Sequence, residues 1–491
     1  MLRPSDVANL VKKEEAWSPE VVLLPGLVAW SAARVEREVG LPVRKGPRNF
    51  ADLPALLGSF RLDDLSHDVA ADRVMTKDVE RNWTEFLDRL REDQASFTGT
   101  RNFLLGKSEN AVPVGRDFPP VVVAQVLDAT TSDWSQVRDE VEHFLAQGAR
   151  VVDLGATAAE SHPDRLATLV NRVKEQFDVP VAVDSMRKEE VLAGVDAGAD
   201  LVLSADLGNF NDVVDRLPRD VAVVAIPTNQ AKGKFQRGVD DRVDNLVGLV
   251  SRLLDAGFRK VLADPLLESP VQPGCLRSLA AYHAFRERSP HDVPLLMGTE
   301  NVTEMCDFDS PGVNGLLAAL AVECGAGALL TTEASNKTRG CVGELVRAVK
   351  LASVARWKRA PPKDFPFHAL VCKSKKGADP LADLDAILAE NGPRNVKFFE
   401  ITAASDPSYE EDPMGYFKFH VDHHAGLLVA LHYDADHRLA GVARGATAEA
   451  LCKALLRAGW VSSAEHAAYV GRELARAEAA LRCKATYIQE D

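Results

Sequence analysis

Short apolar runs alternate with amphipathic segments through the middle of the chain. From residue 121 to residue 358, each run is rich in β-branched residues and leads, after Gly, Asp, Ser or Pro, into a segment with apolar positions at helical spacing. The clearest helix candidates are 134–147, 187–197 and 339–356. The eight apolar runs are 121–127, 151–154, 181–183, 201–203, 221–226, 261–263, 295–297 and 328–330.

Eight strand–helix units within about 240 residues predict an α/β fold, a (β/α)8 TIM barrel, because such barrels typically take about 250 residues. An open doubly wound sheet is the alternative. Gly148, Gly198 and Gly327 each stand just before a predicted strand, which fits the left-handed turn that ends many helices. We therefore assign these glycines to the fold.

The pattern changes on both sides of the barrel. Strands at 21–24 and 41–43 predict a small N-terminal α/β domain, followed by helical segments and a polar, Gly-rich linker at 91–117. After Pro361-Pro362, alternation at 417–421 and 427–432 and a long helical pattern at 464–481 predict an α+β domain. The predicted domains are thus 1–116 with the linker, 117–360 and 361–491.

Composition narrows the classes of function. The 58 Lys plus Arg and 72 Asp plus Glu give a net charge of −14, which repels a nucleic-acid backbone. The seven cysteines form no CxxC pair, which favours reduced thiols in a cytoplasmic protein. No apolar run approaches the roughly 20 residues of a membrane-spanning helix, so we expect no membrane partner.

Polar residues close most of the predicted barrel strands. Active sites of such barrels lie at the carboxyl ends of the strands, so these residues are candidates. A single Asp there, such as Asp153, is more simply explained as a helix cap or another structural group. Several together can accept hydrogen bonds from a heterocycle or hold Mg²⁺ beside a diphosphate. The candidates are Asp128, Asp153, Asp184, Ser204, Asp264, Thr299, Glu300, Asn301 and Glu333.

Several of these strand ends resemble motifs of dihydropteroate synthases. Segment 179–185 ends in Asp184-Ser185 like the third-strand motif of that family, and segment 260–265 ends in Asp264-Pro265 like its sixth-strand motif. Segments 125–130 and 294–299 resemble its first-strand and seventh-strand motifs. The resemblance implies that Asp184 and Asp264 contact the amino and N–H edge of a pterin.

The sequence also departs from the usual family pattern. Val302 stands near the place of the seventh-strand lysine, Leu330 and Thr332 stand in place of an Arg-x-His pair, and Ser204 replaces an asparagine. Segments 45–54, 298–305 and 330–340 are similar to dihydropteroate synthase-related proteins of archaea and methylotrophic bacteria, which are associated with tetrahydromethanopterin biosynthesis. Segments 412–417 and 466–481 are similar to a C-terminal domain of that subgroup, which also resembles part of the corrinoid methyltransferase A subunit.

The resemblance implies a transferase that joins an arylamine to 6-hydroxymethyl-dihydropterin diphosphate with release of diphosphate. The arylamine implied is 4-(ribofuranosyl)aminobenzene phosphate, and the usual assembly in the family is a homodimer. Mg²⁺ and cations must neutralise the leaving group, so we expect Asp128 to hold Mg²⁺ and Lys337 and Arg339 to face the diphosphate. Both basic residues are alternatively solvated surface groups. Asp128, Asp184 and Asp264 are the expected catalytic residues.

Two other functions remain open at the level of sequence. A pterin-dependent methyltransferase needs no diphosphate site, and a pterin carrier or assembly scaffold needs no catalysis. The cluster formed by His420, Asp422, His423, His424 and His432 suggests a metal, but its positions on a strand and at a turn favour surface or packing roles. The basic loop 232–237 either reaches a phosphorylated substrate or is merely solvated.

Overall fold

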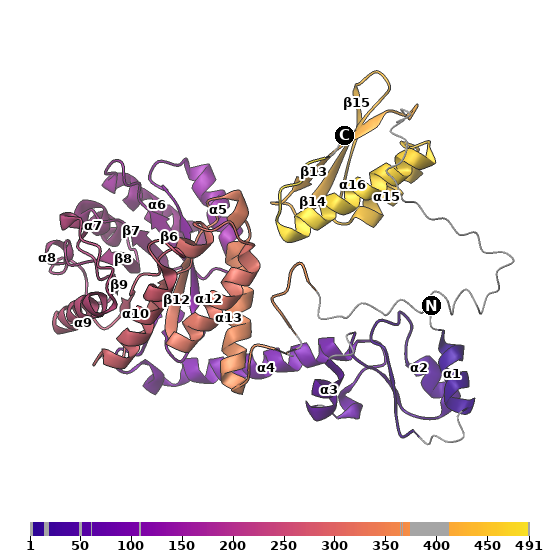
Figure 1. Ribbon diagram of the computed structural model, residues 1–491, viewed down its shortest axis with the longest axis horizontal. Coiled ribbons are helices and arrows are strands. Elements are labelled where there is room, and N and C mark those ends of the chain that lie inside the picture. The colour runs from indigo at the N-terminus through magenta and orange to yellow at the C-terminus, as the bar shows by residue number, and fades with distance from the viewer. Residues whose placement is uncertain are drawn as a thin grey trace. The chain divides into compact units, whose positions relative to one another are not determined.

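A computed structural model describes residues 3–13, 19–48, 52–59, 61–107, 110–363, 365, 367–373 and 412–489, without the side chains of Ala55, Ser59, Gln94 and Ser204. The chain divides into two compact units (Figure 1). The first comprises Met1–Arg48 and Asp52–Leu370, and the second comprises Asn49–Ala51 and Val371–Asp491. The predicted N-terminal domain and barrel thus fall in one unit.

Eight parallel strands form a closed barrel in the first unit, in the order β10-β11-β12-β5-β6-β7-β8-β9, which confirms the predicted TIM barrel. Their apolar runs are nearly continuous because both faces of each strand are buried, one by the helices and one by the barrel interior. The strands are β5 (Val121–Val126), β6 (Val151–Gly155), β7 (Val181–Asp184), β8 (Leu201–Ala205), β9 (Ala222–Ala225), β10 (Val261–Ala263), β11 (Leu295–Gly298) and β12 (Ala326–Thr331).

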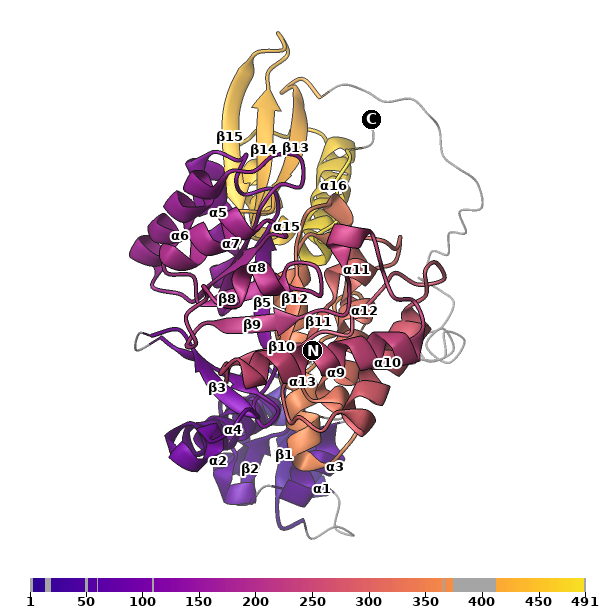
Figure 2. The ribbon, with the colours of Figure 1, turned by 90° about the vertical axis from the view of Figure 1, so that its left-hand side faces the viewer.

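Helices surround the barrel strands, as Figure 2 shows. Their apolar faces join the outward strand residues in one core that includes Phe144, Leu169, Leu246 and Phe285. Within the described residues, no helix is both long and apolar enough to cross a membrane. The helices are α5 (Trp134–Ala146), α6 (Pro163–Phe177), α7 (Lys188–Asp196), α8 (Phe210–Val213), α9 (Val239–Asp255), α10 (Cys275–Arg288), α11 (Glu300–Thr303), α12 (Ser310–Cys324) and α13 (Cys341–Lys358).

The N-terminal part of the first unit contains two short parallel strands, β1 (Val22–Leu24) and β2 (Val43–Lys45), as the sequence predicts. The long helix α4 then runs along the barrel. The indole rings of Trp83 in α4 and Trp357 in α13 lie 5.5 Å apart, and Glu80 pairs with Lys350 at 2.5 Å. The helical elements are α1 (Pro4–Lys13), α2 (Ala33–Val39), α3 (Leu53–Ser59), η2 (Leu62–Asp64), α4 (Ala71–Glu92) and η3 (Gln94–Phe97).

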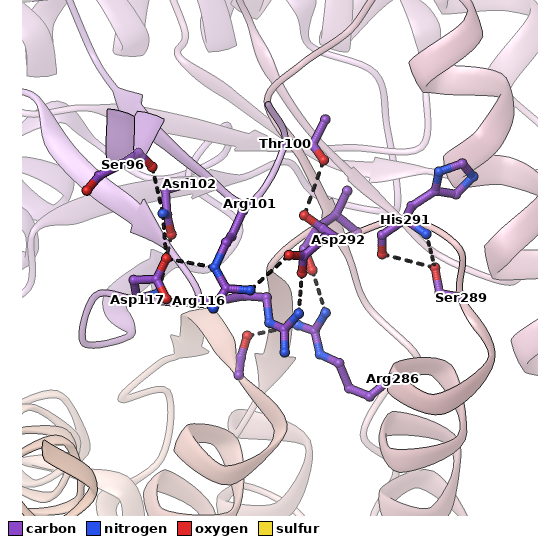
Figure 3. A network of polar contacts seen from close by, with 12 residues as sticks. Ser96, Thr100, Arg101, Asn102, Arg116, Asp117, Arg286, Ser289, His291 and Asp292 are labelled. Atoms are coloured by element: carbon purple, nitrogen blue, oxygen red, sulfur yellow. Dashed lines mark hydrogen bonds and ion pairs between the residues drawn. The ribbon is translucent and has the colours of Figure 1, made fainter. Parts of the chain in front are cut away.

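Segment 91–117 is not a plain linker, because it contains the antiparallel hairpin of β3 (Asn102–Leu105) and β4 (Val112–Gly115). Phe103, Leu105 and Val114 share a core with inward residues of the barrel strands, so the hairpin closes the amino-terminal end of the barrel. An ion-pair network in which Arg101 bonds Asp117 and Asp292 anchors its base (Figure 3). The linker prediction missed two four-residue strands, which are too short to leave a clear period.

Within residues 412–489, the second unit has an antiparallel sheet and two helices, which agrees with the predicted α+β class. Phe417 and Phe419 pack against Leu474 of the last helix, whereas His420 on the opposite face is exposed. His432 is buried and its ring stacks on Trp460. The elements are β13 (Tyr416–Asp422), β14 (Leu427–Tyr433), β15 (Leu439–Gly445), α15 (Ala448–Arg457) and α16 (Ala464–Cys483).

Substitution of Gly327 tests how closely the hairpin packs against the barrel. A Cβ atom there would lie 2.8 Å from Cβ of Pro294 and 2.9 Å from the backbone nitrogen of Gly115. We expect Gly327→Ala to lower the free energy of unfolding by about 1–3 kcal/mol in chemical denaturation. Gly315→Ala is the control: Gly315 lies within α12 with no atom near its Cβ position, so this variant should gain up to about 1 kcal/mol. Equal stability of the two variants would contradict the close approach.

Candidate active site

A cavity of about 660 Å³ lies at the carboxyl ends of the barrel strands. Its floor is apolar, and polar side chains from several different strands stand around it. This is the position at which barrels of this fold carry their sites. The polar lining residues are Gln125, Thr157, Asp184, Ser185, Arg187, Gln230, Asp264, Glu300, Asn301, Glu304 and Thr332.

Strand alternation decides which side chains reach this cavity. In β5, Val122 and Ala124 face the helices, whereas Val121 and Val123 face the barrel interior. Gln125 continues the inward series. In the later strands, every second side chain likewise points into the barrel. The last inward side chains lie at the mouth, where Asp184, Asp264 and Glu300 line the cavity.

Gln125 links two carboxyl groups at the first three strands. Its Nε2 donates to Oδ2 of Asp153 at 2.7 Å and to Oδ2 of Asp184 at 3.1 Å. Asp153 is completely buried beneath the cavity, and its Oδ1 has no hydrogen-bond partner among the described residues. Burial, followed by the nearby charge of Asp184, raises the pKa of Asp153 well above its usual value. This shift favours the protonated form of Asp153 beneath the cavity.

Asp264 is held by the helix that follows its strand. Its Oδ1 accepts hydrogen bonds from the Tyr282 hydroxyl at 2.6 Å and from the Leu266 backbone N–H at 2.8 Å. The residue is only 6% exposed, and burial raises the pKa of its carboxyl group to about 6. Asp264 is therefore mostly ionised at pH 7 and lines the cavity in a fixed orientation.

Glu300 begins α11, just after the seventh barrel strand. Its Oε1 accepts from the Asn301 side chain at 3.1 Å, whereas its Oε2 is buried and has no partner among the described residues. Burial, together with the charges of Asp264 and Asp184, raises the pKa of Glu300 to about 8. The cavity thus holds a carboxyl group that is mostly protonated at pH 7.

Arg187 is the sole arginine or lysine among the described residues that line the cavity. Its guanidinium donates to the backbone carbonyls of Thr157, Ala158 and Glu160, so it holds the loop between β6 and α6. Sequence reasoning missed Arg187 as a site residue. The available signal was its position three residues after Asp184, in the loop that follows a barrel strand.

Two predicted site residues point away from the cavity and hold the mouth together. Thr299 donates its N–H and its hydroxyl to the carbonyl of Leu330, at 2.8 and 2.9 Å. Glu333 accepts from the Val342 backbone N–H at the start of α13, and its other oxygen lies 3.1 Å from Nε2 of His143. Both residues are one position out of phase with the inward side chains of their strands.

The predicted diphosphate and metal residues are not among those that line the cavity. Lys337 pairs with Asp307 at 3.0 Å, and Arg339 donates to Asn336 at 2.7 Å. Asp128 is exposed. Asn301 lines the cavity, whereas the side chain of Ser204 lies outside the described ones. Within the described ranges, no group of three or more His, Cys, Asp or Glu residues is arranged to hold a metal ion.

Comparison with known proteins defines the class of the barrel. Residues 125–327 match the family model of pterin binding enzymes, and residues 411–490 match a second model, PterinBD-DUF4346. The barrel is therefore similar to pterin binding enzymes, and the C-terminal unit is similar to the PterinBD-DUF4346 family.

Individual proteins are similar to most or to part of the chain. The chain is 29% identical over 478 residues to an uncharacterized protein of Methanocaldococcus jannaschii, across 96% of this chain and 86% of that protein. It is 27% identical over 139 residues to a dihydropteroate synthase of Streptococcus pyogenes, across 26% of this chain and 52% of that enzyme. The match thus spans about half of that synthase. The crystal structure of the Burkholderia cenocepacia dihydropteroate synthase complexed with 7,8-dihydropteroate is 18% identical, with a TM-score of 0.40, and aligns with 54% of this chain and 99% of that chain.

Glu300 should make stability depend on pH in an identifiable way. Its pKa is near 4.5 in the unfolded chain and about 8 in the folded one, so the folded state keeps a proton that the unfolded state loses. Its contribution is therefore full below pH 4.5 and declines as pH rises toward 8, by at most about 1.4 kcal/mol per pH unit.

Denaturation at pH 5.5 and 7.5 measures this contribution. We expect Glu300→Gln to reduce the loss of stability between the two pH values by about 1–2.5 kcal/mol, because the amide does not titrate. Glu175→Gln is the control, since Glu175 is exposed on α6 and should leave the pH dependence unchanged. An unaltered slope in Glu300→Gln would show that Glu300 titrates normally.

Proposed function

We propose that this chain is a transferase of the dihydropteroate synthase type, which binds a pterin in the barrel mouth. The observation that carries the proposal is a cavity bordered by acidic side chains, one of which has a buried oxygen without a partner in the described part of the chain. Oε2 of Glu300 makes no hydrogen bond within the described residues, and the Tyr282 hydroxyl and the Leu266 N–H both bond Oδ1 of Asp264. Buried polar atoms are nearly always satisfied, so a ligand that offers an acceptor to Glu300 and N–H donors to the other carboxyl groups suits this cavity.

A pterin has the complementary chemistry. Its amino group and ring N–H groups form a donor edge, and the carboxyl oxygens of Asp184 and Asp264 can accept hydrogen bonds from it. The pterin ring also carries a carbonyl acceptor, and the protonated carboxyl group of Glu300 can donate a hydrogen bond to it. The apolar side chains of Leu203, Ile226 and Leu296 line the same cavity and provide contact for the ring faces.

The reaction we propose joins the bound 6-hydroxymethyl-dihydropterin diphosphate to an arylamine, 4-(ribofuranosyl)aminobenzene phosphate, in tetrahydromethanopterin biosynthesis. The amine nitrogen forms a bond to the pterin methylene carbon, and the bond from that carbon to the diphosphate oxygen breaks. Positive charge that develops on the pterin ring is stabilised by Asp184 and Asp264, which are fixed before the reaction begins. Diphosphate leaves with the bonding electron pair, and the amine nitrogen, which becomes cationic as its new bond forms, releases one proton to the solvent.

The protein must supply positive charge to neutralise the leaving diphosphate. Arg187 supplies one positive charge at the cavity. Mg²⁺ commonly takes one or two protein carboxylates and completes its shell with water and phosphate oxygens, so exposed Asp128 suits it only together with the substrate. Mg²⁺ would supply charge neutralisation there. To contact the diphosphate, Lys337 must leave its ion pair with Asp307, and Arg339 must leave its hydrogen bond to Asn336. We place the enzyme in the cytoplasm, as a homodimer.

A pterin-dependent methyltransferase is the second candidate, and a specific observation favours it. Among the described residues that line the cavity, Arg187 is the sole lysine or arginine, whereas Asp184, Asp264, Glu300 and Glu304 are acidic. Methyl transfer from a tetrahydropterin releases no diphosphate and therefore needs no cation cluster. A pterin carrier without catalysis would need none either.

Product analysis by mass spectrometry separates these functions. The full chain is incubated with 6-hydroxymethyl-dihydropterin diphosphate, Mg²⁺ and either p-aminobenzoate or the ribosylated arylamine phosphate. We expect the coupled dihydropterin product, and a loss of at least about tenfold in turnover for Lys337→Gln and for Arg339→Gln if each meets the diphosphate. Arg138→Gln, an exposed change on α5, is the control.

The alternative functions predict other results. Tight binding of methyl-tetrahydropterin with demethylation in the presence of a corrinoid, and no coupled product, would identify a methyltransferase. Pterin binding with neither product would identify a carrier. Either result would overturn the proposed condensation, while pterin binding itself would stand.

A further inference from the structure

A second cavity, of about 270 Å³, lies at the other end of the barrel, between α4 and α13. It shares no lining residue with the cavity at the mouth. Its volume is somewhat below the roughly 300–1,000 Å³ of pockets for drug-sized ligands, which limits an occupant to about one substituted ring. The lining residues are Trp83, Phe86, Leu90, Arg116, Asp117, Phe118, Pro119, Pro120, Val322, Ser353, Arg356 and Trp357.

Three aromatic rings form one wall of this cavity. The ring centroids of Trp83 and Phe86, both on α4, lie 5.6 Å apart. Trp357, on α13, lies 5.5 Å from Trp83 and 5.6 Å from Phe86. Such a cluster offers ring faces and edges to a planar aromatic guest at contact distances that aromatic pairs prefer.

Two polar groups that line the same cavity are unsatisfied. Ser353 is 5% exposed, and its Oγ is buried with no hydrogen-bond partner among the described residues. Nε of Arg116 is also buried and has no partner among the described residues, although Nη1 of the same guanidinium donates to Asp292. Buried polar atoms without partners are rare, and two in one small cavity indicate atoms that a ligand would satisfy.

The surroundings of this cavity carry more positive than negative charge. Figure 3 shows Arg101, Arg116 and Arg286 gathered around only two carboxylates, Asp117 and Asp292. Arg286 makes its hydrogen bonds to backbone carbonyls instead. Burial, followed by the charge of Arg116, lowers the pKa of Arg286 to about 9. An anion placed beside Arg116 would relieve this repulsion.

We propose that this cavity binds a small planar aromatic acid. Its ring lies against Trp83, Phe86 and Trp357, and its carboxylate accepts hydrogen bonds from Nε of Arg116 and Oγ of Ser353. Arg356, which lines the cavity and donates to the Val322 carbonyl, adds a second positive charge. The ligand touches both α4 and α13 and therefore stabilises their packing. This proposal is independent of the reaction at the barrel mouth.

Titration calorimetry on the full chain tests the site with three probes. Benzoate has both the ring and the charge, benzamide has the ring alone, and acetate has the charge alone. We expect benzoate to bind with a Kd of about 1 mM or below, as suits a ligand of its size, and the other two to bind at least about tenfold more weakly. Absence of benzoate binding, or equal binding of benzamide, would overturn the proposal.

Variants show where benzoate binds. Ser353→Ala should weaken benzoate binding about fivefold without lowering stability, because the hydroxyl has no partner to lose. Arg356→Gln should weaken it by a similar factor. Arg138→Gln and the mouth variant Glu300→Gln are controls that should leave the affinity unchanged. A stable Ser353→Ala that binds benzoate normally would contradict the assignment, as would displacement of benzoate by 6-hydroxymethylpterin, which would place benzoate at the mouth.

Discussion

Burial of several carboxyl groups around one barrel mouth is the condition to which the rest of the site responds. Asp153 and Asp264 are almost wholly withdrawn from water, and Glu300 has a buried oxygen. A buried charge is costly unless it is paired, so burial raises the pKa of Asp153, of Asp264 and of Glu300, and Glu300 is mostly protonated at pH 7. The site therefore presents hydrogen-bond acceptors in fixed positions together with one acidic donor, Glu300. A heterocycle that carries several donors and an acceptor can bond to these groups.

The fold keeps these groups in place with contacts that a ligand does not need to make. Tyr282 fixes Asp264 from α10, and Gln125 fixes Asp184 from the first barrel strand. The hairpin of β3 and β4 fills the opposite end of the barrel, so the strands beneath the mouth are packed throughout. Preorganisation of this kind lets the protein recognise a flat ligand without a rearrangement of its interior.

Much of the fold could be read from the sequence, because eight apolar runs with helices between them leave few other architectures. Asp184 and Asp264 were also within reach, since both close such runs. The sequence did not separate them from Thr299 and Glu333, because that choice depends on whether a side chain lies in phase with the inward positions of its strand. Arg187 was missed because its role comes from a loop about 30 residues away, which no local pattern reveals.

The same reasoning explains why the cations were harder to place than the carboxylates. A helix start after the eighth strand is a common phosphate site, which drew attention to Lys337 and Arg339. Local partners, Asp307 and Asn336, hold both side chains instead. The charge balance of the mouth is thus a property of the folded structure. The short strands of the hairpin were overlooked for a related reason, since their pairing depends on packing under the barrel.

Proton exchange on binding of 6-hydroxymethyl-dihydropterin is the most direct measure of the central claim. Near pH 6 about half of Asp264 is protonated, and donors on the ligand favour its ionised form. Calorimetry in two buffers of different ionisation enthalpy should therefore show net proton release, and Asp264→Asn should bind more weakly with less release. Proton uptake, or an Asp264→Asn variant that binds and releases protons like the natural protein, would contradict recognition of the pterin by these carboxylates.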